Sequence, residues 1–493
     1  MLKLKELLKN TEVKWSTPYS GDEAITEVVA DSRKVKPGCM FVCLKGTKKD
    51  GHDYIDEAVR RGAYAVLCSE NCTVRPENTV VIGVNNTHSE YAKIMSVVCG
   101  EPDKRLKLIA VTGTNGKTTV TNMICSALEY LGKKTALIGT LGAYYDGVKS
   151  SIGTMTTPDP ERLYPLLKSY ADKGAEYAVM EASSHALALG KLDGLHFILS
   201  AMTNLTPEHL DFHGSMEEYA KAKSHLFRLS DKAVFCIDDS YTSGLASECP
   251  CPAYSCSVRD KDADFYADSP RLDGVNGISF TLCHRNINTS VRSDIPGTFT
   301  VSNALIACSV LSLLGFSDAE AAEGVYSLHG VKGRMEKLPI DKNFSVFIDF
   351  AHTPDALSKL LETVRAFRNP GQRIVTLFGC GGDRDPSKRS LMGAIASRLS
   401  DFVIVTADNS RTENTGDIID EIMRGFDKKC PHVRIEDRRK AIYYAVQNAG
   451  KGDIILLCGK GHEEYEIDKS GMHPFSERET VYAACRVNQD DCT

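Results

Sequence analysis

One segment constrains the fold more than any other: an apolar stretch from Leu106 to Val111 leads directly into Gly113–Thr119, which reads GTNGKTT. Glycines in such a turn let successive backbone N–H groups point at a phosphate, and a following helix presents its positive end. Apolar residues then recur at helical spacing from Val120 to Leu131. The order of strand, loop and helix predicts a phosphate-binding loop rather than an incidental glycine turn.

Two side chains of this loop have chemistry of their own. Lys117 is expected to reach the β- and γ-phosphates of a nucleotide, and the Thr118 hydroxyl to ligate Mg²⁺. The sequence therefore predicts a nucleotide site at the start of the helix.

The composition is that of an ordinary globular protein. Apolar residues make up 42% and charged residues 25% of the 493, and the formal net charge is −6. Such a balance gives no overall attraction to nucleic acid, so no nucleic-acid partner is expected. A chain of this length is expected to form roughly two to four domains.

The seventeen cysteines are scattered and include no CxxC pair, which favours a reducing compartment over a disulfide or zinc framework. The densest cluster, Cys249, Cys251 and Cys256, is interpreted as free thiols in a loop. The N-terminal MLKLKELLKN is a charged amphipathic turn rather than a signal peptide, and the longest apolar stretch, Ala304 to Phe316, is too short to span a bilayer. We therefore expect a cytoplasmic protein without a membrane span.

Changes of pattern predict three domains. Residues 1–103 show short strands, Met40–Leu44 and Ala65–Cys68, around a helix at Tyr54–Arg61, and end at a proline hinge. Residues 104–335 contain the phosphate loop, and residues 336–493 have strands of their own. In both later domains strands alternate with helices, which predicts mostly parallel, doubly wound sheets with ligands beyond the carboxyl ends of the strands. The strands expected there are Tyr177–Met180, Phe197–Ala201, Ala233–Ile237, Val346–Phe350, Ile374–Phe378, Phe402–Thr406 and Ile454–Cys458.

Polar loops follow two strands of the second domain. Glu181 ends one strand, and His209 lies in the loop after the next, so both are expected near a γ-phosphate, where they could help to hold Mg²⁺. A lone histidine at a strand end is usually structural, but three histidines in this pair of loops favour a functional site. Lys221 and Lys223 lie two residues apart on a predicted helix and do not share a face, which is typical of a solvated helix.

Four polar loops follow strands of the third domain. They contain Arg, Asp, Asn and Glu, as a ligand with both ammonium and carboxylate groups would need. Any one of them could be ordinary turn chemistry. Because they converge on one sheet edge, we expect a site for a zwitterionic ligand. These loops are Asp349–Asp355, Gly379–Asp385, Asp408–Arg411 and Gly459–Glu463.

In combination and in order, these motifs resemble the Mur ligases over nearly the whole chain, and within that family the members that add the third residue of the peptidoglycan precursor peptide. The motifs that support the resemblance are Asp31-Ser32-Arg33, Asp50-Gly51-His52, GTNGKTT, Thr156-Thr157-Pro158, EASSHAL, TNLTPEHLDFHG, Asn303, GVKGRME, DFAHTPDAL, GCGGDRD and GKGHE.

The resemblance implies an α/β chain of three domains, with a central P-loop domain and a C-terminal Rossmann-like domain. It implies ATP-dependent amide formation through an acyl phosphate, with ATP and Mg²⁺ as cofactors. UDP-MurNAc-L-Ala-D-Glu would be the substrate to which a diamino acid, the acceptor, is joined. A monomer is expected. The alternatives are a folylpolyglutamate-type ligase, against which the long N-terminal region and Asp31-Ser32-Arg33 argue, and a nucleotide-gated binding protein without turnover.

The resemblance also implies roles for individual residues. The ATP-binding residues would be Gly113, Thr114, Asn115, Gly116, Lys117, Thr118, Thr119, Asn303, Arg334, Asp349 and His352. The UDP-MurNAc-dipeptide would contact Ser32, Arg33, Thr156, Thr157, Ser184 and Lys191. The catalytic residues would be Lys117, Glu181, His209 and Lys223, and the metal site would contain Thr118, Glu181, His209 and Lys223, with Lys223 carbamylated. The acceptor amino acid would contact Arg389, Asp408, Asn409, Arg411, Gly459 and Glu463.

Three positions depart from the family pattern: Lys191 replaces an arginine, Ser410 a proline and Glu208 an aspartate. Arg411 remains, and its guanidinium could pair with the second carboxylate of meso-diaminopimelate but would face the ammonium of L-lysine unpaired. The sequence therefore predicts meso-diaminopimelate, with Arg389 also on the ligand and Glu463 paired with its distal ammonium. L-lysine or another diamino acid is the alternative, because Ser410 loosens the turn before Arg411.

Overall fold

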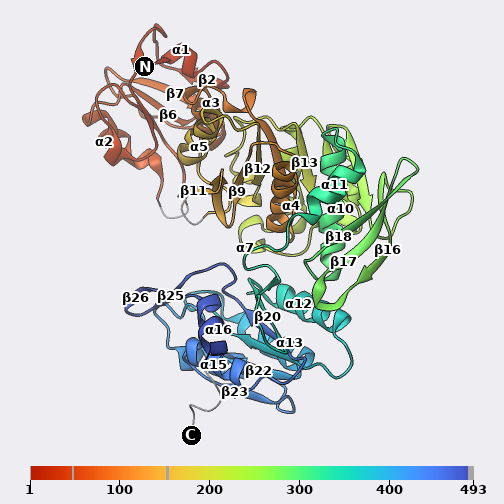
Figure 1. The fold of residues 1–493 in the computed structure, drawn as a ribbon. Coiled ribbons are helices and arrows are strands. Elements are labelled where there is room, and N and C mark those ends of the chain that lie inside the picture. Colours follow the sequence, from red (N-terminus) through yellow and green to blue (C-terminus); the bar gives the residue numbers. More distant parts are fainter. Residues whose placement is uncertain (1, 47–48, 151–154, 487–493) are drawn as a thin grey trace. The chain divides into compact units, whose positions relative to one another are not determined.

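The computed structural model describes residues 2–46, 49–150 and 155–486 and divides the chain into two compact units (Figure 1). The first unit contains residues 1–266 and 305–324, and the second contains 267–304 and 325–493. Helix α10 (Thr298–Leu313) contributes residues to both, and α11 (Asp318–Tyr326) follows it.

The first unit begins with a small five-stranded sheet of order β2-β7-β6-β5-β4, in which β4 to β7 are parallel and β2 is antiparallel. Tyr91 and Ala92 of its helix α3 share a hydrophobic core with Leu163 and Tyr164 of α5 (Pro160–Asp172). The elements of this part are β1 (Leu2–Lys3), α1 (Leu4–Leu7), β2 (Val13–Ser16), β3 (Ala24–Ile25), β4 (Val28–Val29), β5 (Met40–Val42), α2 (Ile55–Arg60), β6 (Ala65–Ser69), β7 (Val80–Val84) and α3 (Thr87–Val98).

The phosphate loop follows the central strand of a larger sheet. Its strand β8 (Lys107–Thr112) lies between β12 and β13 and is buried from Leu108 onward, as expected for a strand covered on both faces. The parallel strands are β9 (Thr135–Gly139), β12 (Tyr177–Glu181), β8, β13 (Leu199–Met202), β14 (Ala233–Cys236), β15 (Ala253–Ser257) and β16 (Phe265–Leu272), while β10 (Gly142–Tyr145) and β11 (Val148–Ser150) are antiparallel. The helices are α4 (Lys117–Tyr130), α5, α6 (Ser184–Ala188), α7 (Leu210–His213), α8 (Met216–Arg228) and α9 (Ser240–Ser247).

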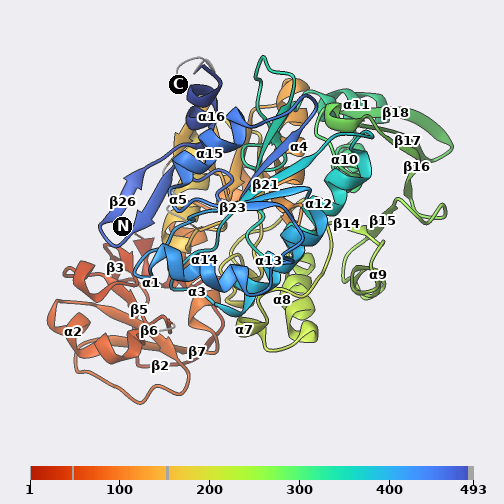
Figure 2. The ribbon, with the colours of Figure 1, turned by 90° about the horizontal axis from the view of Figure 1, so that it is seen from below.

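The second unit is built on a six-stranded sheet of order β19-β20-β24-β21-β22-β23, parallel except for β19. One apolar core joins the sheet to α12, α13 and α14, and another joins it to α15 and α16, so helices cover both faces (Figure 2). The strands are β19 (Glu336–Lys337), β20 (Ser345–Asp349), β21 (Ile374–Phe378), β22 (Phe402–Val405), β23 (His432–Arg434) and β24 (Ile454–Cys458). The helices are α12 (Pro354–Phe367), α13 (Ser387–Leu399), α14 (Thr415–Met423), α15 (Arg438–Gln447) and α16 (Glu477–Arg486), and the hairpins are β17 (Ile278–His284) with β18 (Ile287–Ser293) and β25 (Tyr465–Asp468) with β26 (Gly471–Pro474).

The predicted fold class is confirmed: the sheets are mostly parallel and helices alternate with strands. The expected strands are all present, although Phe197–Ala201 is shifted to Leu199–Met202. The predicted helix at Tyr54–Arg61 is shorter, because a 3₁₀ turn at Gly51–Tyr54 precedes α2. The boundaries of the three domains stay a prediction. None of the described helices is long and apolar enough to cross a bilayer, and the described cysteines are free thiols.

Candidate active site

The phosphate loop joins β8 to α4 through two glycines with positive φ, Gly113 (139°) and Gly116 (88°). A Cβ on Gly113 would lie 1.8 Å from the Thr203 Oγ1 atom, so only glycine fits there. Lys117 Nζ donates to the carbonyl oxygens of Gly113 at 2.9 Å and Thr114 at 2.8 Å. The lysine is therefore already held over the loop from which it extends.

The loop after β13 holds the phosphate loop from outside. Asn204 accepts hydrogen bonds from Thr114 N at its carbonyl (2.9 Å) and from Asn115 N at Oδ1 (3.0 Å), while Thr203 Oγ1 donates to Asn115 O at 2.6 Å. Neither Thr203 nor Asn204 had a predicted role of its own, because nothing in their spacing shows that they meet a loop some ninety residues away.

Glu181 is a buried carboxylate beside the start of α4. It is 1% exposed, and its Oε2 accepts from Thr118 Oγ1 at 3.1 Å. Thr140 donates to this carboxylate from N to Oε1 (2.8 Å) and from Oγ1 to Oε2 (3.1 Å), and Thr140 Oγ1 also contacts Thr156 Oγ1. Thr157 Oγ1 donates to the Glu181 carbonyl at 2.9 Å. Four of the predicted residues, Thr118, Glu181, Thr156 and Thr157, are thus brought together.

Lys223 is buried, contrary to the expectation of a solvated helix. On α8 it is 1% exposed, whereas the Lys221 side chain is 76% exposed, because the two lie on different helix faces. Its Nζ donates to Gly113 O at 2.7 Å and lies 4.6 Å from the centroid of the Tyr219 ring. Burial, and then the charge of Lys117, lower the pKa of Lys223 well below its usual value. This lysine therefore has a stronger tendency than others to be a neutral amine.

Three histidine rings lie close together, His185 from α6 and His209 and His213 from the segment that follows β13. His209 has a φ of 55° and a side chain that is 45% exposed, and its ring lies 4.9 Å from His185. His213 Nε2 lies 3.0 Å from the Ser184 hydroxyl. Burial, followed by the neighbouring rings of His209 and His213, lowers the pKa of His185 to about 4, so it is neutral at pH 7.

The remaining residues predicted for the nucleotide-sugar contact acidic side chains. Ser32 is buried and donates to Glu57 Oε2 at 3.2 Å, while the Arg33 side chain is 82% exposed and pairs with Asp31 at 2.7 Å. Lys191 Nζ forms an ion pair with Asp159 at 2.5 Å. The Asp159 carboxylate therefore neutralises the charge of Lys191.

Three of the predicted nucleotide residues, Arg334, Asp349 and His352, lie around the end of β20. Removal from water raises the pKa of Asp349, which accepts from Met335 N at 2.7 Å and Ala351 N at 2.9 Å. The Arg334 guanidinium lies 4.8 Å from the centroid of the Phe350 ring. Burial lowers the pKa of His352, and Asn303 on α10 is 5% exposed.

Loops after β22 and β24 bring most of the predicted acceptor residues together. Asn409 Nδ2 donates to Glu463 Oε2 at 2.8 Å, and burial raises the pKa of Glu463. A Cβ on Gly459 would lie 2.7 Å from Asp408 Oδ2, so the loop passes close to that carboxylate. Arg411, with a φ of 51°, donates from Nη1 to Gly382 O at 2.7 Å.

Arg389 is placed differently from the other acceptor residues. It is 2% exposed and donates to both carboxylate oxygens of Glu413, at 2.8 and 2.9 Å, to Glu421 at 2.9 Å and to Gly381 O at 3.2 Å. This guanidinium ties the loop after β21 to the loop after β22. Direct contact between Arg389 and the acceptor stays a prediction.

Ser410, the position that departs from the family pattern, is buried. Its hydroxyl lies 2.7 Å from Thr415 Oγ1 at the start of α14. This hydrogen bond restrains the turn where the family has proline.

Three family models match the chain: "Mur ligase family, catalytic domain" over residues 24–110, "Mur ligase middle domain" over 111–311 and "Mur ligase, glutamate ligase domain" over 333–461. A protein of Caldanaerobacter subterraneus subsp. tengcongensis named UDP-N-acetylmuramoyl-L-alanyl-D-glutamate--2,6-diaminopimelate ligase is 41% identical over 97% of this chain and 98% of its own length. The chain belongs to the Mur ligase family. It is therefore an ATP-dependent ligase, and the predicted family and enzyme class are confirmed.

Other relatives of this Mur ligase agree with that assignment. A protein of the same name from Clostridioides difficile is 39% identical over 93% of this chain and 94% of its own. A solved structure of a protein with that name has a TM-score of 0.72 and 30% identity, and the match covers 98% of both chains. The match over residues 24–110 covers the N-terminal region that argued against a folylpolyglutamate-type ligase.

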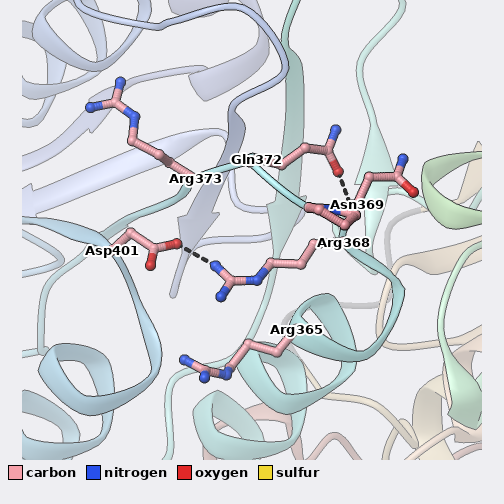
Figure 3. A pocket seen from close by; sticks show the side chains of 8 residues that line it. Arg365, Arg368, Asn369, Gln372, Arg373 and Asp401 are labelled. Carbon is pink, nitrogen blue, oxygen red and sulfur yellow. Dashed lines mark hydrogen bonds and ion pairs between the residues drawn. The ribbon is translucent and has the colours of Figure 1, made fainter.

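A hollow of about 560 Å³ lies at the amino ends of strands of the six-stranded sheet, opposite the predicted acceptor residues (Figure 3). Gln372 and Arg373 precede β21, and Asp401 precedes β22, so the hollow lies at the amino ends of the strands. Arg368 pairs with Asp401 at 2.5 Å, and Arg373 pairs with Asp453. The predicted acceptor residues lie at the carboxyl ends, and none of them lines this hollow.

A buried ion pair that was not predicted lies beneath the acceptor loops of this Mur ligase, which are the loops after β21, β22 and β24. Arg438 is fully buried, pairs with Glu477 at 2.7 Å and donates to the carbonyls of Ala407 and Cys458, both at 2.8 Å. These carbonyls immediately precede Asp408 and Gly459. Arg438 therefore fixes the starting points of two acceptor loops.

Proposed function

We propose that this Mur ligase joins meso-diaminopimelate to the D-glutamyl γ-carboxylate of UDP-MurNAc-L-Ala-D-Glu, with ATP as the energy source, in peptidoglycan synthesis. The observation that supports it best is the charge pattern of the acceptor loops. They present a guanidinium, Arg411, together with the carboxylates Asp408 and Glu463, as a ligand with carboxylates and ammonium groups requires. The names of the relatives describe the same reaction for those proteins.

We propose that the phosphate loop and Lys117 bind the ATP phosphates, with Asn303, Arg334, Asp349 and His352 contributing to nucleotide binding. Hydrogen-bonded oxygen atoms of Thr118 and Glu181 are the ligand type that Mg²⁺ prefers, so this cluster fits the ion. When bound, Mg²⁺ would offset negative charge on the transferring phosphoryl group. His209 is a further candidate ligand.

The reaction has two steps, a phosphoryl transfer and then an acyl transfer. A γ-carboxylate oxygen attacks the γ-phosphorus, the bond to ADP breaks and an acyl phosphate forms. The acceptor amine then attacks the carbonyl carbon, a C–N bond forms, the nitrogen loses a proton and phosphate leaves, which gives the amide. Lys117 supplies positive charge where the phosphoryl group moves, and Thr156, Thr157 and Ser184 are proposed to orient the dipeptide.

We propose that Lys223 acts as an anion rather than a cation. A neutral amine can attack carbon dioxide, form a C–N bond and lose a proton to give a carbamate. The lowered pKa of Lys223 favours the neutral amine that this needs, and its contact with Gly113 places it beside the phosphate loop. The carbamate would be an oxygen ligand for a second Mg²⁺.

A direct assay tests the proposal: phosphate release is measured with ATP, the UDP-MurNAc-dipeptide and one amino acid at a time. We expect release only when all three are present, with a product heavier by one diaminopimelate residue. ATP hydrolysis without the dipeptide, or a product carrying glutamate, would contradict it. Cytoplasmic location and a monomeric state stay predictions.

A further inference from the structure

The loop after β24 contains a fully buried lysine that has no role in the site described so far. Lys460 is 0% exposed, and its Nζ donates to Asn409 Oδ1 at 2.9 Å and to Tyr465 O at 2.8 Å. Burying an ammonium is costly unless strong acceptors surround it. The hydrogen-bond acceptors around Lys460 therefore indicate its role.

The first of those partners is a side-chain amide with two distinct ends. Asn409 Oδ1 accepts from Lys460 Nζ and also from Ile467 N at 3.1 Å, so two donors face this atom. The NH₂ end is then left to donate to Glu463 Oε2 at 2.8 Å. A rotated amide would direct its NH₂ group at the lysine ammonium and lose all three hydrogen bonds.

The ammonium also acts on Glu463 through its charge. Burial and the charge of Asp408 raise the pKa of Glu463, while the Asn409 amide and the Lys460 charge act in the opposite direction and favour the ionised carboxylate. Lys460 thus supports Glu463 in two ways, through the Asn409 hydrogen bond and through the field of its charge.

We propose that Lys460 is a positioning residue for the acceptor amino acid: it fixes the orientation of the Asn409 amide and thereby holds Glu463 as an ionised partner for the distal ammonium of the diamino acid. This inference rests on the proposed function, because it assumes a diamino acid at this site. Lys460 would act through Asn409 and Glu463 without contacting a substrate itself.

The same lysine also ties the β25 strand to the loop after β22. Ile467 exchanges hydrogen bonds with this loop, donating to Asn409 Oδ1 and accepting from Arg411 N at 3.0 Å. A purely structural role for Lys460 would therefore disturb Arg411 as well, and with it the choice between diaminopimelate and lysine. A positioning role through Glu463 would weaken both amino acids alike, because both have a distal ammonium.

The test is steady-state kinetics of Lys460→Met, with Lys451→Met, an exposed lysine of the same unit, as control. We expect the KM for the diamino acid to rise about tenfold or more, with kcat and the KM values for ATP and the dipeptide within about threefold. The ratio of kcat/KM between diaminopimelate and L-lysine should stay unchanged. An unchanged acceptor KM, an equal rise in all three KM values, or a changed ratio would overturn the proposal.

A double-variant cycle with Asn409→Leu tests the route. Because Lys460 acts on Glu463 partly through Asn409 and partly through its charge, the loss in the double variant should be smaller than the sum of the two single losses, whereas fully additive losses would show that Lys460 acts independently of Asn409. Should Lys460→Met not fold, Asn409→Asp replaces it. Aspartate still accepts a hydrogen bond from Lys460 but offers no donor to Glu463, so the same rise in the KM for the diamino acid is expected. An unchanged KM for the diamino acid would overturn the proposal. Wild-type enzyme that prefers L-lysine would contradict the proposed function alone, and the Lys460 series would then be measured with lysine.

Discussion

The phosphate loop of the first unit and the acceptor loops of the second both follow parallel strands, but different groups hold them in place. The phosphate loop is one continuous stretch whose lysine hydrogen-bonds to its own carbonyls. The acceptor loops follow three separate strands and are joined by buried cations, Arg389, Arg438 and Lys460. Changes in the phosphate loop should therefore affect every turnover, whereas changes in the acceptor loops should affect recognition of one substrate.

The largest effect is expected for Lys117→Ala. Removing the positive charge from the moving phosphoryl group should lower kcat by roughly 10³-fold for every acceptor. Thermal unfolding should change little, and Lys134→Ala, an exposed lysine after α4, should be normal. Normal turnover by a folded Lys117→Ala enzyme would disprove the assignment of the phosphate loop.

Lys223→Ala should lower kcat by roughly 10²-fold or more, because a metal ligand is lost. Lys221→Ala, on the exposed face of the same helix, is the matched control and should retain activity. A small carboxylate added to Lys223→Ala should restore part of the rate. An intact mass without the added carbon dioxide, measured on active wild-type enzyme under conditions that preserve carbamates, would argue against the modification.

The effect of Arg411→Ala should depend on which acceptor amino acid is used. We expect kcat/KM for meso-diaminopimelate to fall by roughly tenfold or more, since a charge-assisted pair is lost. The value for L-lysine should stay the same or rise. An equal fall for both amino acids would show that Arg411 supports the loop rather than reading the carboxylate.

The smallest effect is expected for Ser410→Pro, which restores the family residue. The variant loses the hydrogen bond to Thr415, worth about 1 kcal/mol, but proline restricts the unfolded chain by a similar amount, about 0.4–1 kcal/mol. The free energy of unfolding and kcat/KM should therefore stay close to wild type. A loss of diaminopimelate activity above tenfold would show that the serine itself serves the site.

The two regions also differ in how much of them could be predicted. The phosphate loop could be predicted from the sequence because glycine spacing and helical periodicity are local properties. The strand ends of both sheets could be predicted from runs of apolar residues. The burial of Lys223 could not be predicted, since two lysines on one helix look alike until tertiary contacts, here with Gly113 and Tyr219, bury one of them. Lys460, Arg438 and the Asn204 contacts with the phosphate loop were missed for the same reason: their partners lie far away in the sequence, and only tertiary structure brings them together.

The central claim is that the acceptor loops select a diamino acid with a second carboxylate. The most direct test is kcat/KM for meso-diaminopimelate and L-lysine, measured side by side on the wild-type enzyme with saturating ATP and UDP-MurNAc-L-Ala-D-Glu. The pairing of Arg411 with the second carboxylate predicts a preference for meso-diaminopimelate of at least about tenfold. A preference for L-lysine or ornithine would contradict the assignment and show that Arg411 does not face the acceptor.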